Sequence, residues 1–327
     1  MPSSTANSLL DLLQSHLGPE LLQVEKSLAK VFSSRRTPLT DEVGQYLRQA
    51  AGKRIRPILT LLSTKGLAGD AIAAAPVAAA MECVHIASLL HDDVIDQAPL
   101  RRGTETVQRR YGSDVAILMG NFLYSHAFQL LLDTTDPRPL QILTRATARM
   151  CEGEMLQIQL GQGPVEKEQC LRVITDKTAH LISACTALGA VVAGAQEDAI
   201  DAMAAYGLEL GMAYQIVDDA LDYVGADSNW GKAPGTDLRE GKWTLPLIRT
   251  MAVATPDDGK ALLEIWNNGR SLSDVLDIVE RYDGIEHCFA LARDHAARAT
   301  EHLSSLETND SLDLLRALPE FVVSRTH

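Results

Sequence analysis

Residues 84–96 read VHIASLLHDDVID, and residues 211–222 read GMAYQIVDDALD. Each apolar run ends in two aspartates, two other residues and a further aspartate. Residues four apart share one face of a helix, so the outer aspartates are neighbours: Asp92 with Asp96, and Asp218 with Asp222. Such like-charge pairs destabilise a helix. A solvated acidic face would explain one cluster, but two clusters, each entered through an apolar run, indicate a cation bound between them.

The aspartates favour a particular kind of cation. Oxygen ligands without clustered Cys or His favour Mg²⁺ or Mn²⁺ over Zn²⁺. Mg²⁺ usually binds one or two carboxylates and completes its shell with water and substrate phosphates. The two clusters therefore predict a two-sided Mg²⁺ site that clamps a diphosphate.

Composition limits the other possibilities. The 327 residues contain no Pro-, Gly- or Ser-rich linker, so we expect one domain over residues 1–327, with residues 1–20 as a loosely packed N-terminal helix. A net charge of −13 argues against nucleic-acid binding, which needs basic surfaces. Five scattered cysteines without metal-binding spacing indicate a reducing compartment. No uncharged apolar run reaches about 18 residues, and the first residues, MPSST, lack a basic region followed by an apolar core. We therefore expect a cytoplasmic protein with neither stable membrane insertion nor a signal peptide.

Abundant Ala and Leu, and the rarity of alternating strand patterns, predict an all-α chain. The expected helices lie near residues 6–16, 19–33, 40–51, 55–66, 76–96, 113–133, 138–161, 167–175, 179–194, 197–223, 242–254, 257–267, 271–281, 284–306 and 310–324. Residues 225–241 form a polar, Gly-rich segment after the second cluster. For this segment a mobile lid and a plain connector both remain open.

Basic residues accompany the acidic clusters. Lys53 and Arg56 lie three apart at the start of an expected helix, and an arginine pair follows the first cluster. Each could be a salt-bridge partner of a nearby aspartate. Together they could supply the charge that two diphosphates need beyond Mg²⁺, through bidentate Arg and point-charge Lys contacts.

Further motifs occur in a definite order: GKRIRP at 52–57, RRG at 101–103, EGEMLQ at 152–157, KTA at 177–179 and GK at 241–242. With the two aspartate clusters, this set resembles the trans-isoprenyl diphosphate synthases (the polyprenyl synthetase family), and is most similar to the long-chain octaprenyl-type enzymes. The resemblance covers essentially the whole chain after its first 20 or so residues. It implies a single large helical bundle of the isoprenoid synthase type, with a central cavity between antiparallel helices. The chain departs from the family pattern at Ala51, where Gly is frequent, and at Asn121, where Asp is common.

The resemblance also implies roles for individual residues. Each site would bind three Mg²⁺ ions when substrate is present, and Mn²⁺ could replace them. Their ligands would be Asp92, Asp96 and Asp218, supported by Asp93, Asp219 and Asp222. The allylic diphosphate would be contacted by Arg101, Lys177, Gln215, Lys232 and, on closure, Lys242. The diphosphate of isopentenyl diphosphate would be bound by Lys53, Arg56, His85 and Arg102. Oxygen dipoles of Thr178 and Gln215 would face the allylic cation.

The positions one and two turns before Asp92 carry no aromatic residue. Ala87 and Ser88 lie one turn before Asp92, and Val84 and Cys83 lie two turns before it. In the family that the sequence resembles, a bulky aromatic residue at the one-turn positions stops growth at fifteen carbons. We therefore predict a long-chain product, octaprenyl diphosphate (C40) within a range of C35 to C50, for a quinone side chain. The floor of the tunnel is left open among Leu118, Phe122 and Leu143.

Three other functions share some of these features. A geranylgeranyl or farnesyl diphosphate synthase has every catalytic motif. A class I terpene cyclase would need neither the second basic pocket nor the matching second cluster, and a non-catalytic subunit of a heteromeric synthase usually loses one acidic motif. The resemblance also implies a homodimer, in which the helix at 113–133 would supply apolar surface to the interface, to the core or to both.

Overall fold

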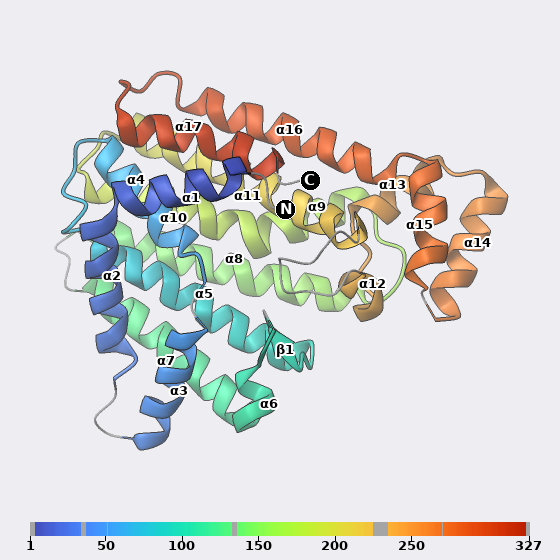
Figure 1. Ribbon diagram of the computed structural model, residues 1–327, viewed down its shortest axis with the longest axis horizontal. Coiled ribbons are helices and arrows are strands. Elements are labelled where there is room, and N and C mark those ends of the chain that lie inside the picture. Colours follow the sequence, from blue (N-terminus) through green and yellow to red (C-terminus); the bar gives the residue numbers. More distant parts are fainter. Residues whose placement is uncertain are drawn as a thin grey trace.

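The computed structural model describes residues 4–33, 37–50, 52–101, 103–132, 136–224, 235–269 and 271–324. Figure 1 shows a bundle of long helices, which confirms the predicted all-α fold. Its helices are α1 (Ser4–His16), α2 (Gly18–Val31), α3 (Pro38–Gln49), α4 (Ile55–Gly66), α5 (Ala75–Ile95), α6 (Val107–Tyr111), α7 (Ser113–Leu132), α8 (Arg138–Leu160), α9 (Lys167–Ile174), α10 (His180–Val192), α11 (Glu197–Val224), α12 (Thr236–Glu240), α13 (Leu245–Val253), α14 (Pro256–Asn267), α15 (Leu272–Arg281), α16 (Gly284–His302) and α17 (Asp310–Val323).

The helix α10 lies at the centre because its sequence, HLISACTALGAVV, carries no Asp, Glu, Lys or Arg and is apolar nearly all round. It packs against α4, α5, α8 and α11. The two helices that carry the aspartate clusters, α5 and α11, therefore share one central neighbour. In Figure 1, α8, α11 and α16 run along the long axis of the molecule, and α14 and α15 stand at one end.

The predicted helix positions agree with the structure for the long, strongly periodic segments. Four short features were not predicted: α6, α12, and the strands β1 (Leu100–Arg101) and β2 (Thr104–Glu105), which pair antiparallel. Each is five residues or fewer, too short for a periodic pattern. The expected break between residues 175 and 179 is wrong, because a π-helical turn, Thr175–Ala179, joins α9 to α10 without interruption.

The N-terminal helix α1 packs on the bundle. Leu13 of α1 and Leu17, which links α1 to α2, are buried, and His16 Nε2 lies 2.8 Å from Ser311 Oγ in α17.

Within the described residues, α7 is one helix whose length and composition would allow it to cross a membrane, a feature not singled out from the sequence. Ala116, Leu123 and Ala127 form a buried stripe on this helix, which packs against α5. Leu118 and Leu132 lie outside that stripe and are 66% and 64% exposed. The helix therefore has a core face and a second apolar face.

Candidate active site

The first aspartate cluster ends α5. Asp93 is buried and accepts hydrogen bonds from Arg101, whose Nε and Nη2 both lie 2.7 Å from Asp93 Oδ1. Because Arg101 belongs to β1, this ion pair holds the hairpin against the end of the helix. Asp92 and Asp96 are half-buried, and the Asp96 N–H donates to the Asp92 carbonyl at 2.8 Å, which keeps them one turn apart.

The Asp92 carboxylate lies in an electrostatically unfavourable place. Burial raises the pKa of Asp92 to about 6. Lys177 opposes that shift, whereas the negative charges of Glu154 and Asp96 add to it. A cation beside Asp92 would offset both the desolvation and the repulsion between carboxylates.

The second cluster lies on the last turns of α11. Asp219 is buried and accepts a hydrogen bond from Gln215 Nε2 at 2.8 Å; burial raises the pKa of Asp219 well above its usual value. Asp222 accepts the backbone N–H groups of Thr236 at 3.1 Å and Asp237 at 2.9 Å. Asp222 thus fixes the first turn of α12 against the end of α11.

Lys242 connects the two clusters. It follows α12, and its Nζ lies 3.1 Å from Asp96 Oδ2 and 2.7 Å from Glu240 Oε2. Burial lowers the pKa of Lys242, but Asp96 and Glu240 outweigh burial, so the net shift is upward. Since Asp222 holds the start of α12 and Asp96 holds Lys242 at its end, α12 bridges the two clusters.

A third side of the site comes from the π-turn. Lys177 Nζ contacts the Glu154 carboxylate and donates to Gln157 Oε1 at 3.0 Å, which joins the turn to α8. Thr178 Oγ1 donates to Gln215 Oε1 at 2.9 Å, which joins it to α11. π-turns inside helices are frequent at functional sites. Here the turn presents consecutive side chains to two different helices.

The predicted second pocket draws on the residues just before α4, on the first turn of α4 and on α5. Lys53 is exposed, and Arg56 and His85 are half-buried. Within the described ranges, Arg56 Nε is buried and has no hydrogen-bond partner. A buried donor of this kind is unfavourable unless an anion or water completes it. Three residues of the prediction, Ala51, Arg102 and Lys232, lie outside the described residues, as do residues 225–234 of the candidate lid.

The donor set fits a metal that arrives with its substrate. In the part of the chain that the structure describes, no three His, Cys, Asp or Glu side chains are grouped tightly enough to hold a metal by themselves. Mg²⁺ does not require such a group, because phosphate oxygens and water complete its shell. The all-oxygen clusters and the destabilised Asp92 carboxylate suit this mode of binding.

Sequence reasoning gave no role to Glu154 or Gln157, although their motif was noted. The signal was their i, i+3 spacing on one helix face, which lets both reach Lys177.

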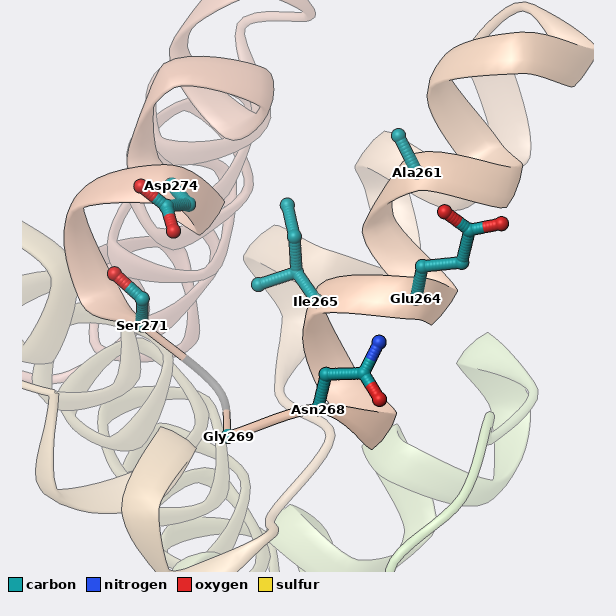
Figure 2. A pocket seen from close by; sticks show the side chains of 7 residues that line it. All are labelled: Ala261, Glu264, Ile265, Asn268, Gly269, Ser271 and Asp274. Carbon is teal, nitrogen blue, oxygen red and sulfur yellow. The ribbon is translucent and has the colours of Figure 1, made fainter.

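A separate pocket lies between α14 and α15 and contains none of the predicted site residues. Figure 2 shows its lining side chains, which include Glu264, Ile265 and Asp274.

Comparisons with known proteins identify the family of this chain. The sequence model of the polyprenyl synthetase family matches residues 37–282. The chain is 37% identical to the short chain isoprenyl diphosphate synthase of Methanothermobacter thermautotrophicus (86% of this chain, 89% of that protein). It is 32% identical to the octaprenyl diphosphate synthase of Haemophilus influenzae (97% and 98%). A crystal structure of a polyprenyl synthase from Caulobacter crescentus CB15, complexed with calcium and isoprenyl diphosphate, superposes with a TM-score of 0.91 at 32% identity (96% and 97%).

The helical bundle, its paired aspartate clusters and these relatives define a trans-prenyl diphosphate synthase, a class of prenyltransferase. The chain belongs to the polyprenyl synthetase family.

Proposed function

We propose that this protein is a Mg²⁺-dependent all-trans-polyprenyl diphosphate synthase that condenses isopentenyl diphosphate head to tail (1′-4) onto an allylic diphosphate. The observation that carries the proposal is the bridge between the clusters: Asp222 holds one end of α12, and Lys242 at its other end reaches Asp96. Residues of both aspartate clusters and the basic side chain of Lys242 thus meet around α12.

The allylic half of the reaction would use residues from α5, α11, the π-turn and the segment after α12. Asp92, Asp96 and Asp218 would hold Mg²⁺, which when bound would stabilise the negative charge of the departing pyrophosphate. Lys177 and Lys242 would move from their present carboxylate partners to the diphosphate oxygens. The Thr178 and Gln215 side chains, joined by their hydrogen bond, would direct oxygen dipoles toward the allylic cation.

The second half concerns isopentenyl diphosphate. Lys53, Arg56 and His85 would bind its diphosphate, and the buried Arg56 Nε is the kind of donor that such an anion satisfies. Its double bond would attack the allylic cation, and the proton would leave to the released pyrophosphate. A terpene cyclase needs no such second pocket.

The product we propose is octaprenyl diphosphate, for a quinone side chain. Relatives range from short-chain to octaprenyl synthases, so the proposal depends on α5. Cys83, Val84 and Ala87 are buried, and their side chains are small or medium in size. Ser88 is half-buried, and its hydroxyl donates a hydrogen bond to the His85 carbonyl at 2.9 Å. No side chain among them is bulky enough to stop a growing chain one or two turns from Asp92.

Product sizing tests this function. Purified protein with farnesyl diphosphate, isopentenyl diphosphate and Mg²⁺ should give a main product of eight isoprene units. Ser88→Phe should shorten it by several units, because the ring would occupy space one turn before Asp92. Reversed-phase chromatography of the dephosphorylated alcohols measures both.

The control for Ser88→Phe is Ser273→Phe, at an exposed position of α15, which should make the same product as the wild type. An unchanged product length in Ser88→Phe would refute the tunnel along α5, and a geranylgeranyl product from the wild type would favour the short-chain alternative.

We further propose a homodimer through the second apolar face of α7. Leu118→Asp should weaken the dimer by about 30-fold or more, because a charge would be buried at a large apolar contact. Sedimentation equilibrium measures the dissociation constant of the dimer. Leu22→Asp, at an exposed leucine of α2, should leave the dimer intact. Equal behaviour of the two variants would exclude this face.

For the tunnel floor, Leu143 is fully buried, whereas Leu118 lies on the exposed face of α7. Leu143 is therefore the better candidate within one subunit, and Leu118 is better suited to the interface.

A further inference from the structure

Arg54 has an unusual backbone conformation inside the GKRIRP segment. It lies between Lys53 and Arg56 and immediately before the first residue of α4. Its φ of 56° and ψ of 35° place it in the left-handed region, which is sparsely populated by residues other than Gly, Asn and Asp. Such a conformation persists only when the surroundings hold it in place.

The surroundings of Arg54 are two carboxylates from two different helices. Its Nε lies 2.7 Å and its Nη2 3.4 Å from the oxygens of Glu25 in α2. Its Nη1 lies 2.8 Å from Glu82 Oε1 in α5. The Arg54 side chain is 10% exposed and that of Glu82 is 5% exposed. A planar guanidinium suits this two-sided contact, and a Lys ammonium does not.

These contacts separate Arg54 from its basic neighbours. Its guanidinium nitrogens already face carboxylates, so a diphosphate would have to displace a buried ion pair to reach them. Arg56, by contrast, has a buried Nε without a partner among the described residues. In this segment Arg54 is therefore paired with carboxylates of the protein, whereas Arg56 has a donor available for an anion.

The ion pairs also determine where the second pocket lies. Glu82 is three residues before His85, so both point to the same side of α5. Arg54 is adjacent to Lys53 and two residues from Arg56. One buried contact thus fixes the distance between the two segments that supply the predicted isopentenyl diphosphate ligands.

We propose that Arg54, held by Glu25 and Glu82, is the positioning residue of the isopentenyl diphosphate pocket: it fixes Lys53 and Arg56 relative to His85 and does not itself bind substrate. This inference rests on the proposed function, since it assigns the residue to one of the two substrate pockets. The allylic diphosphate site shares α5 with this contact through Glu82, but Asp92 lies ten residues, about 15 Å, further along that helix, and the site's other residues, on α11 and the π-turn, do not contact Arg54 in the bonds described above.

The test compares the two substrates. In the full-length protein with Mg²⁺, Arg54→Ala and Glu82→Gln should raise KM for isopentenyl diphosphate by about 10- to 100-fold, because small misplacements of binding groups have effects of that size. KM for the allylic diphosphate should stay close to the wild-type value. Arg54→Lys should not restore the wild-type KM, because it cannot bridge both carboxylates. Calorimetric titration with isopentenyl diphosphate should show the same loss of affinity.

The matched control is Glu20→Gln, which removes another buried glutamate, on α2, whose Oε1 pairs with Lys65 of α4 at 3.0 Å. It should change thermal stability without a selective change in either KM. Glu25→Gln, at a more exposed partner, serves as a second positioning variant if Arg54→Ala does not fold.

Three results would overturn the inference. One is an equal rise in both KM values, which would indicate a general structural role. Another is a Glu20→Gln variant that reproduces the selective rise, and the third is wild-type kinetics in both Glu82→Gln and Glu25→Gln. A wild-type protein that neither binds nor condenses isopentenyl diphosphate would overturn the proposed function as well, so the two failures are distinguishable.

Discussion

Asp218→Ala should lower kcat by about 10³-fold with farnesyl and isopentenyl diphosphates as substrates. The proposed role of this carboxylate is to hold Mg²⁺ from the α11 side, opposite Asp92 and Asp96. A metal stabilises the negative charge of the leaving group, and losing that stabilisation should raise the activation free energy by about 4 kcal/mol. An increase of about 4 kcal/mol corresponds to a rate about 10³-fold lower. A radiolabel transfer assay at a Mg²⁺ concentration that saturates the wild-type protein measures the rate.

Two further measurements make this result specific. Asp201→Ala removes an exposed aspartate from the same helix and should leave kcat unchanged. Raising Mg²⁺ should recover part of the activity of Asp218→Ala, because the remaining carboxylates and the diphosphate still bind the ion. If Asp218→Ala retained wild-type kcat, the two-sided metal site would be wrong.

The aspartate clusters and their helices were predictable because the relevant information is local. An apolar run followed by aspartates four apart specifies a buried helix with an acidic end, and α5 and α11 have that form. Asp93 and Asp219, the middle aspartates of the two clusters, are each buried and hydrogen-bonded to a neighbouring side chain, and their support of a metal stays a prediction.

The remaining part of the site depends on contacts between distant residues. Lys242 and Asp96 are 146 positions apart, and Thr178 and Gln215 are 37 apart. No periodicity records such pairs. The π-turn was missed for a related reason: one extra residue in a helix disturbs the 3.6-residue period, and the sequence then resembles a break. Arg54 was passed over because basic residues in a row look equivalent until their partners are seen.

Gly153→Ala should lower both stability and activity, because α8 touches the backbone of the π-turn at this residue. A Cβ on Gly153 would lie 2.7 Å from the backbone nitrogen of Lys177 and 3.0 Å from Asp176 Cβ. On the other side, a Cβ on Gly211 of α11 would lie 2.6 Å from Ala179 Cα. The turn that carries Lys177 is thus held between two glycines, and neither contact can be relieved by rotating a side chain.

We expect Gly153→Ala to destabilise the fold by about 1–3 kcal/mol, the usual range for overpacking. The displaced π-turn should move the Lys177 ammonium and reduce kcat/KM for the allylic diphosphate by about 100-fold. Thermal unfolding and steady-state kinetics measure the two effects.

The control is Gly259→Ala, in the helix α14, where a Cβ would meet only Met251 Cε at 3.8 Å. It should raise stability by about 0.5–1 kcal/mol, because alanine is the better helix former and the space is open. Opposite signs for the same substitution would show that the close approach, and not glycine's flexibility, is what the site requires at Gly153. Full activity in Gly153→Ala would mean that the π-turn tolerates displacement, and the position of Lys177 would then have to be maintained by Glu154 and Gln157 instead.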